Sequence, residues 1–296
     1  MMDVGFVGLG VMGLPMARHL QHAGHRLHLW ARRPQSVAPF AGSDAVVHDS
    51  PAALAAATDV AFSVVTGSAD VERLALGADG LIHGARPGWV QVDMSTIAPA
   101  SARRIAAALE ARGAAMLDAP VSGGAQGAQD ATLAIMVGGS ADVLERLRPL
   151  LTCLGRTIVH VGDSGAGQVA KACNQMIMVA AIEACAEAMH LANAHGVDLA
   201  AVRSALLGGS AASRVLEVMG ERMVRRDFTA GIESRLHHKD FGILMDEAAR
   251  LGAPLPIAAQ VWQQLNALMA GGGGRDDTSS LLRVLEASTT EQSARS

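Results

Sequence analysis

One lysine in a long apolar segment is the side chain of this sequence best suited to acid–base chemistry. Between Ser164 and Ile182 the only charged residue is Lys171. Asn174 and Gln175 follow three and four residues later, which on a helix puts them on the same face as Lys171. Apolar surroundings favour the neutral amine that a general base needs. A lysine whose ammonium extends to water is the alternative, but the two neighbouring amides favour a site.

A second candidate is the segment Ser122-Gly123-Gly124, which follows a proline and a valine. Its two glycines leave backbone N–H groups accessible beside the Ser122 hydroxyl. A concave set of donors of this kind suits a carboxylate ligand. A flexible turn between two elements has the same composition, so the sequence leaves both interpretations open.

Glycines near the start of the chain predict a nucleotide-binding turn. An apolar run over 4–7 is followed by Gly8-Leu9-Gly10-Val11-Met12-Gly13, and a helical pattern begins directly after it. In such turns the first glycine permits the sharp bend, the second lets the backbone approach a pyrophosphate, and the third lets the helix pack on the strand. A glycine-rich turn without a ligand is the alternative. The strand before the turn and the helix after it favour the nucleotide site.

The segment after the second predicted strand indicates which dinucleotide binds. No Asp or Glu occurs between Asp3 and Asp44, so the carboxylate that usually binds the ribose 2′-hydroxyl of NAD is missing. Arg32 and Arg33 follow the strand predicted over 26–30 instead. Two guanidinium groups suit a 2′-phosphate, so the sequence favours NADP over NAD. NAD stays possible, because two solvated arginines in a loop have the same sequence pattern.

Alternating strands and helices predict the fold class of the first half. Strand patterns lie at 60–65, 89–93, 114–117, 133–137 and 157–161. The alternation predicts an α/β fold with a doubly wound parallel sheet of the Rossmann type. Ligands of such sheets collect beyond the carboxyl ends of the strands, so Val65, Thr66 and Thr96 are expected to border the cofactor.

The second half is helical in pattern. A helix apolar nearly all round runs from about 167 to 193, and further helical segments lie at 198–207, 213–225, 239–251, 256–270 and 278–287. A long helix that is apolar on most sides is typical of burial between domains. We therefore predict a dinucleotide-binding domain over 1–163 and an all-α domain over 164–296 that begins with this interdomain helix.

Composition excludes several classes of function. A net charge of −4 argues against nucleic acid as the main partner. Three cysteines without C-x-x-C spacing indicate neither disulfides nor zinc, and they are predicted to be small core residues in a reducing compartment. No signal peptide and no membrane helix is predicted, so we expect a cytoplasmic protein that does not contact a membrane. The pair His237-His238 lacks a ligand triad, so no metal site is predicted.

Four motifs in register resemble those of the β-hydroxyacid dehydrogenase family, the group of 3-hydroxyisobutyrate dehydrogenase. They are the glycine turn at 8–13, the segment 118–124, the segment from Gly165 through Lys171 to Asn174, and Lys239-Asp240. Their order and spacing match over nearly the whole chain. Around Lys171, at 208–209 and at 277–281 the sequence is most similar to the subgroup of tartronate semialdehyde reductases (2-hydroxy-3-oxopropionate reductases).

The resemblance implies reversible hydride transfer between NAD(P) and a short 3-hydroxy acid, such as glycerate formed from tartronate semialdehyde, or 3-hydroxyisobutyrate. It implies Lys171 as general acid and base, with Asn174 as the second catalytic residue. It places the substrate at Ser122, Gly123, Gly124, Gln175 and Asp240. It places the cofactor at Gly8, Leu9, Gly10, Val11, Met12, Gly13, Arg32, Arg33, Val65, Thr66, Thr96 and Lys239. A homodimer or homotetramer built through the all-α domain is also implied.

The sequence departs from the family pattern at three places. Gln175 stands where many relatives have asparagine, Ala31 where many have asparagine, and Val65-Thr66 where many have Leu-Pro. The first departure leaves the amide role mainly to Asn174, and the other two affect cofactor contacts.

Two other functions fit the same architecture. One is an imine reductase or reductive aminase, which usually has another residue in place of Lys171. The other is a non-catalytic NADP-binding redox sensor, which would not need Lys171, Ser122 and Asn174 together.

Overall fold

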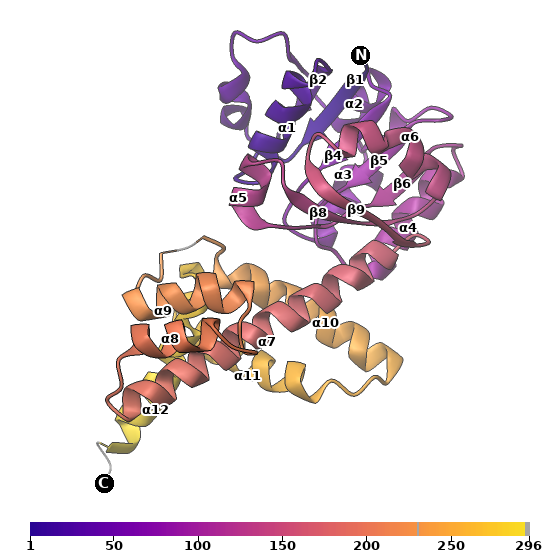
Figure 1. Cartoon of the computed structure of the whole chain (residues 1–296). Coiled ribbons are helices and arrows are strands. Elements are labelled where there is room, and N and C mark those ends of the chain that lie inside the picture. Colours follow the sequence, from indigo (N-terminus) through magenta and orange to yellow (C-terminus); the bar gives the residue numbers. More distant parts are fainter. Residues whose placement is uncertain (230, 294–296) are drawn as a thin grey trace. The chain divides into compact units, whose positions relative to one another are not determined.

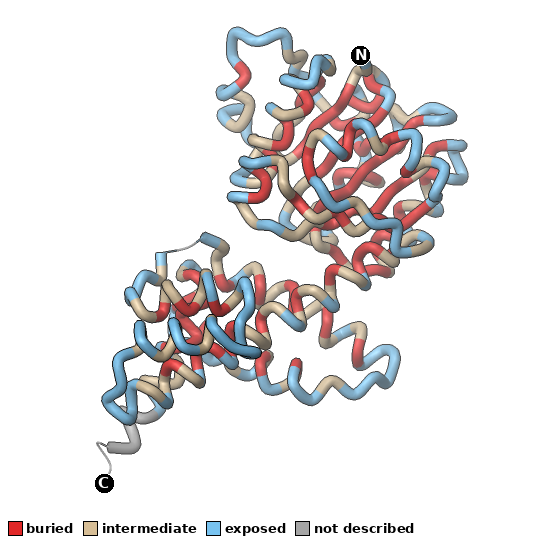
Figure 2. Tube along the Cα trace, viewed as in Figure 1, coloured by how far each residue is buried: buried red, intermediate tan, exposed pale blue. Residues whose placement is uncertain are grey.

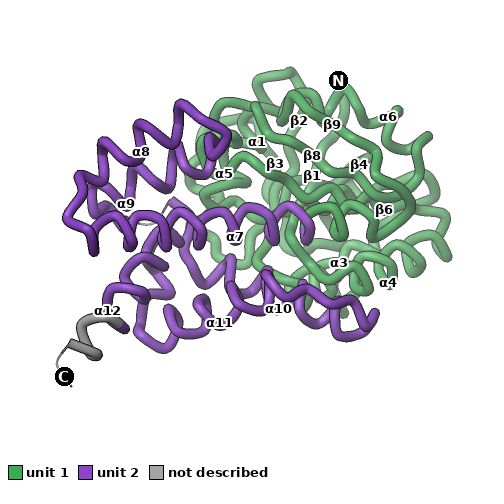
Figure 3. Tube along the Cα trace, turned by 60° about the horizontal axis from the view of Figure 1, so that its bottom comes forward, with its two compact units in different colours: residues 1–171 green, residues 172–296 purple. Residues whose placement is uncertain are grey.

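The computed structural model describes residues 1–229 and 231–293, with side chains up to Ser288 (Figure 1). The chain divides into two compact units, residues 1–171 and 172–296 (Figure 3). Helix α7 (Ala166–Ala194) begins in unit 1 and continues in unit 2. Lys171 is therefore the last residue of unit 1.

Within the described residues, unit 1 is built on a nine-stranded sheet. The strands are β1 (Asp3–Val7), β2 (Arg26–Trp30), β3 (Val46–Val47), β4 (Val60–Ser63), β5 (Val90–Asp93), β6 (Ala115–Asp118), β7 (Val121–Ser122), β8 (Leu133–Gly138) and β9 (Gly155–Gly162). Their order is β3-β2-β1-β4-β5-β6-β8-β7, and β9 pairs with β8. Strands β1 to β6 are parallel and follow the order of dinucleotide-binding folds, which confirms the predicted Rossmann sheet.

The far part of the sheet differs from the all-parallel prediction. Strand β8 runs antiparallel to both β6 and β7, and only β9 is parallel to it. The connection from Ser122 to Leu133 holds just the short helix α5 (Gly124–Gln129), and parallel neighbours need a crossover of about a dozen residues or more. Strands β3 and β7 were not predicted, because two residues are too few to show an alternating pattern.

Helices flank this sheet: α1 (Gly13–His22), α2 (Pro51–Ala56), α3 (Ser68–Leu76), α4 (Pro99–Glu110) and α6 (Ala141–Leu151). The core lies along the strands, where Figure 2 shows the buried residues in red. All residues of β4 and β5 are buried, and the rings of Phe6 and Phe62 stack at 6.1 Å. Strands covered on both sides explain why the sequence of β4 is mostly apolar rather than alternating.

Unit 2 is helical, as predicted, with α8 (Leu199–Leu207), α9 (Glu221–Arg225), α10 (Ser234–Leu251), α11 (Pro256–Ala270) and α12 (Leu281–Ser293) beside most of α7. Helix α10 begins at Ser234, several residues before the predicted start at 239. The Ser234 N–H and hydroxyl both donate to the carbonyl of Asp276, at 2.8 and 2.6 Å. This start depends on a residue far away in the sequence, so no local signal revealed it.

The expectation that all three cysteines are core residues needs correction. Cys185 is buried, but Cys173, on another side of α7, is exposed, and Cys153, in the turn after α6, is half-buried. Helix α7 is long and apolar enough to cross a membrane by length and composition alone, although no membrane helix was predicted. A core helix passes the same test, so this is a weak indication of a membrane span.

Across residues 1–229 and 231–293, no cluster of His, Cys, Asp or Glu could hold a metal ion.

A buried carboxyl group on α7 makes the stability of the protein depend on pH. Glu183 is 5% exposed, and neither of its carboxyl oxygens has a hydrogen-bond partner among the residues that the structure describes. Burial, and secondarily the charge of Glu187, raises the pKa of Glu183 from 4.5 to about 7. The folded chain keeps this proton at pH values where the unfolded chain has lost it. Stability therefore falls as the pH rises from about 4.5 through about 7.

Replacing Glu183 with glutamine is expected to remove this part of the pH dependence. The free energy of unfolding at pH 8 should rise by up to about 3 kcal/mol, with little change at pH 4. Urea unfolding at both pH values measures the effect, and Glu110→Gln, at the exposed end of α4, is the matched control. Equal effects of the Glu183 variant at pH 4 and pH 8 would contradict the ionisation argument.

Candidate cofactor and substrate site

Two glycines of the first turn are required by the protein itself. Gly8 has φ +95°, and a Cβ there would lie 2.0 Å from the Val64 carbonyl oxygen. A Cβ on Gly13 would lie 2.0 Å from the Gly8 carbonyl oxygen. The Leu14 N–H donates to the Gly10 carbonyl at 2.9 Å and so opens α1. The turn is therefore as tight as the sequence pattern predicts.

The middle glycine is different, because nothing lies within 4 Å of a Cβ built on Gly10. The fold itself does not require a glycine there. A missing side chain beside open space, at the start of a helix, is what a pyrophosphate needs to approach the backbone. The turn thus fits a dinucleotide.

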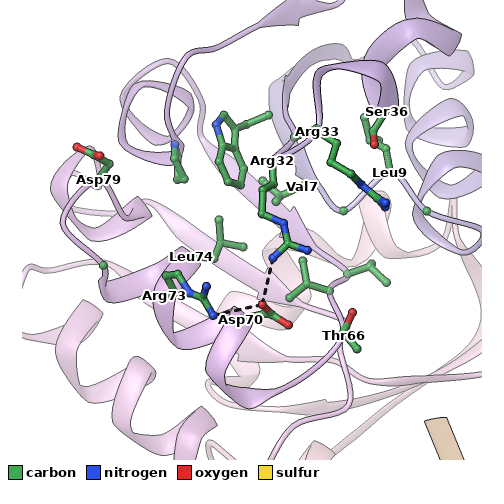
Figure 4. A pocket seen from close by; sticks show the side chains of 18 of the residues that line it. Val7, Leu9, Arg32, Arg33, Ser36, Thr66, Asp70, Arg73, Leu74 and Asp79 are labelled. Atoms are coloured by element: carbon green, nitrogen blue, oxygen red, sulfur yellow. Dashed lines mark hydrogen bonds and ion pairs between the residues drawn. The ribbon is translucent and has the colours of Figure 1, made fainter. Parts of the chain in front are cut away.

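A cavity of about 460 Å³ lies beside this turn (Figure 4). Of the predicted cofactor residues, those that line it are Gly8, Leu9, Gly10, Arg32, Arg33, Val65 and Thr66. Val11, Met12 and Gly13 complete the turn without lining the cavity. The loop that carries Val65 is held by the loop after β5, because the Val65 N–H donates to Ser95 Oγ at 2.9 Å. Ser95 in turn donates to Asp93 at 2.8 Å, and burial raises the pKa of this carboxyl to about 6.

The two arginines after β2 extend in different directions. Arg32 points toward Asp70, with 3.7 Å between its Nη1 and Oδ1 of the carboxylate, whereas Arg33 extends toward Ser36 (Figure 4). Asp70 was not predicted from the sequence, because this carboxylate comes after β4 rather than after β2, where dinucleotide-binding folds usually carry one.

The segment that carries Thr96 is tied to the start of α7 by Gln168, whose side chain is almost fully buried. Gln168 Nε2 donates to the carbonyl of Ser95 at 2.9 Å, and its Oε1 accepts from the N–H of Ile97 at 3.0 Å. These two bonds bracket Thr96. Lys171 lies one turn further along α7 and is 7% exposed. The structure therefore holds Thr96 and Lys171 in a fixed relation within unit 1.

Asp118 anchors the beginning of α7 from the end of β6. Its Oδ1 accepts from the Gly165 N–H at 2.7 Å, and its Oδ2 accepts from the Gln168 N–H at 3.0 Å. Burial raises the pKa of Asp118, and these hydrogen bonds oppose the rise. Gly167 leaves room for this contact, because a Cβ there would lie 2.4 Å from the Asp118 carbonyl oxygen. These roles of Asp118 and Gln168 were not predicted, because the partners of each side chain lie about 50 to 70 residues away in the sequence.

Ser122 ends β7, and two glycines in unusual backbone conformations follow it. Gly123 has φ +137° and Gly124 has φ +61°, where α5 begins. Side chains rarely adopt these angles, so glycine is required for the turn itself. Ser122 and Gly124 are half-buried and Gly123 is exposed, which leaves the segment accessible to a ligand.

The predicted residues of unit 2 form a network of their own. Asn174 Nδ2 donates to Gln175 Oε1 at 2.9 Å, and Gln175 Nε2 donates to Asp240 Oδ2 at 2.5 Å. Lys239 Nζ pairs with Oδ1 of Asp240 at 2.9 Å. The predicted amides and the Lys239-Asp240 motif thus meet, and Gln175 joins them where many relatives have asparagine.

The parallel sheet, the glycine turn with open space at Gly10 and the adjoining cavity define a dinucleotide-binding unit. Residues 3–162 match the family model for the NAD binding domain of 6-phosphogluconate dehydrogenase. Residues 165–285 match the model described as NAD-binding of NADP-dependent 3-hydroxyisobutyrate dehydrogenase. The chain belongs to the 3-hydroxyisobutyrate dehydrogenase family of hydroxyacid oxidoreductases.

Individual relatives agree with this assignment. The chain is 41% identical to 2-hydroxy-3-oxopropionate reductase of Escherichia coli, over 96% of this chain and 97% of that protein. It is 37% identical to NAD-dependent L-serine dehydrogenase of Pseudomonas aeruginosa, over 97% and 98%. The structure of Mycobacterium tuberculosis 3-hydroxyisobutyrate dehydrogenase with L-serine superposes with a TM-score of 0.88, at 33% identity over 96% of this chain and 99% of that one. These relatives are named for short hydroxy or oxo acids, and the names differ in the acid.

Proposed function

We propose that this protein catalyses reversible hydride transfer between NADP and a short 3-hydroxy acid, with Lys171 as general acid and base. The observation that carries the proposal is the placement of Lys171, which is buried at the start of α7. Gln168 fixes that start to the loop after β5, and Asp118 fixes it to the end of β6. Such loops follow the carboxyl ends of the sheet strands, where ligands of this fold bind.

Each group has one task in this scheme. A bound nicotinamide dinucleotide supplies the hydride chemistry. Lys171 takes the proton of the substrate hydroxyl in oxidation and returns a proton to the carbonyl oxygen in reduction. Ser122 and the N–H groups of Gly123 and Gly124 bind the substrate carboxylate. Asn174, with Gln175 and Asp240 behind it, orients the substrate.

The substrate is proposed to be one of the acids for which the relatives are named. Tartronate semialdehyde is the first choice, and L-serine and 3-hydroxyisobutyrate are the others. A panel of these acids, assayed in both directions with both cofactors, tests the proposal. Turnover of cyclic imines without turnover of any 3-hydroxy acid would instead identify an imine reductase. Cytoplasmic location and self-association through the helical unit stay predictions.

NADP is proposed as the preferred cofactor because Arg32 and Arg33 line the cavity. Replacing Arg32 with alanine is expected to lower kcat/KM for NADP about tenfold or more and to change the value for NAD little, since a guanidinium–phosphate contact is lost only with NADP. Steady-state kinetics with both cofactors measure the ratio. If the ratio of kcat/KM for NADP to that for NAD stayed unchanged, Arg32 would not contact the 2′-phosphate.

A further inference from the structure

A carboxylate and an arginine from one helix meet Arg32 at the edge of the dinucleotide cavity. Asp70 and Arg73 lie on α3, and both line the cavity together with Arg32. Oδ1 of Asp70 is 3.7 Å from Nη1 of Arg32 and 3.4 Å from Nη2 of Arg73 (Figure 4). One carboxylate oxygen thus holds two guanidinium groups that come from distant segments of the chain. Asp79, another carboxylate of the cavity wall, points away from this group in Figure 4.

The fold does not depend on this ion pair. The side chains of Arg32 and Arg73 are 75% and 68% exposed, and that of Asp70 is 34% exposed. Exposed ion pairs of this kind add little to folding stability. The two arginines are therefore able to exchange the carboxylate for a stronger anion without disturbing the unit.

We propose that Asp70 and Arg73 determine the cofactor specificity of this site. Arg73 joins Arg32 in binding the adenosine 2′-phosphate, and Asp70 is the internal anion that this phosphate replaces. The inference rests on the proposed use of NADP. A phosphate has more charge and more acceptor oxygens than a carboxylate, so it binds both guanidinium groups more strongly than Asp70 does.

Asp70 then has the opposite effect from Arg73. Its carboxylate stays on α3 beside the bound phosphate and repels it. With NAD, which has no 2′-phosphate, Asp70 keeps the two arginines neutralised. Asp70 therefore limits the preference for NADP, and Arg32 and Arg73 create it.

Binding of adenosine fragments tests these roles without turnover. The probes are 2′,5′-ADP and 5′-ADP, which differ only in where the second phosphate is attached, and the dissociation constants are measured by calorimetry. Arg73→Gln is expected to weaken 2′,5′-ADP about tenfold and to leave 5′-ADP within about twofold. Asp70→Asn is expected to tighten 2′,5′-ADP about threefold. Arg112→Gln, an exposed arginine outside the cavity lining, controls for the loss of one positive charge and should change neither.

Two results would overturn the inference. One is an Arg73→Gln variant that binds 2′,5′-ADP like the wild type. The other is an Asp70→Asn variant that binds 5′-ADP more weakly, because Asp70 would then accept a hydrogen bond from the ribose.

Arg32→Gln in the same assay separates this inference from the proposed function. If Arg32→Gln loses the preference for 2′,5′-ADP and Arg73→Gln keeps it, the proposed use of NADP holds and the role of Arg73 is wrong. If the wild type binds 2′,5′-ADP no more tightly than 5′-ADP, both the proposed use of NADP and the inference about Asp70 and Arg73 are wrong.

Discussion

Replacing Lys171 with alanine is expected to lower kcat about 10²- to 10⁴-fold, while the dissociation constant for NADPH changes less than about twofold. The loss follows from the role of Lys171 as the group that moves the substrate proton. Lys171 does not line the dinucleotide cavity beside the glycine turn, so cofactor binding should persist. Single-turnover rates and a calorimetric titration with NADPH measure the two quantities separately.

A second variant distinguishes proton transfer from positive charge. Lys171 and Lys239 are the only lysines in a sequence with 24 lysines and arginines. Arginine keeps the charge but does not release its proton in proteins, so Lys171→Arg should be nearly as inactive as the alanine variant. If the arginine variant kept most of the turnover, Lys171 would act only through its charge.

Replacing Gly10 with alanine is expected to weaken dinucleotide binding about 10- to 100-fold without destabilising the fold. A Cβ at this position meets no protein atom within 4 Å, so it enters the space that the pyrophosphate needs. The melting temperature should stay the same or rise slightly, because alanine restricts the unfolded chain. Calorimetry with NADPH and thermal unfolding of the free protein measure both effects.

Two further glycine variants serve as controls, one expected to destabilise the fold and one expected to have no effect. Gly13→Ala should lower the melting temperature, because its Cβ would lie 2.0 Å from the Gly8 carbonyl oxygen. Gly209→Ala in unit 2, where the nearest atom is 4.0 Å away, should change neither stability nor binding. Undiminished cofactor affinity in Gly10→Ala would mean that the dinucleotide does not approach the backbone at this turn.

Features whose cause is local could be predicted from the sequence. The glycine turn was predictable because Gly8 and Gly13 answer close contacts between neighbouring elements, and the parallel sheet was predictable from the alternation of strands and helices. The burial of Lys171 was predictable because no other charge occurs nearby on the helix. The capping of α2 is equally local, because Ser50 Oγ accepts from the Ala53 N–H three residues later.

Features that depend on distant contacts could not be predicted. Gln168 pairs with the loop around Thr96, more than 70 residues away, and nothing in the sequence indicates that pairing. Asp70 meets Arg32 only because α3 lies beside the end of β2 in the folded unit. The antiparallel course of β8 depends on a short connection whose sequence resembles that of a flexible turn.

The central claim is that this chain oxidises or reduces the carbon at position 3 of a short acid, and a comparison of 3-hydroxy acids with a 2-hydroxy acid tests it most directly. Initial rates are measured with NADP and NAD for 3-hydroxyisobutyrate, L-serine and glycerate, and for lactate, whose only hydroxyl is on carbon 2. Tartronate semialdehyde is tested in the reductive direction. The account predicts turnover of at least one 3-hydroxy or 3-oxo acid, a higher kcat/KM with the NADP pair, and none with lactate. Turnover of lactate, or of none of these acids by a protein that binds NADPH, would contradict it.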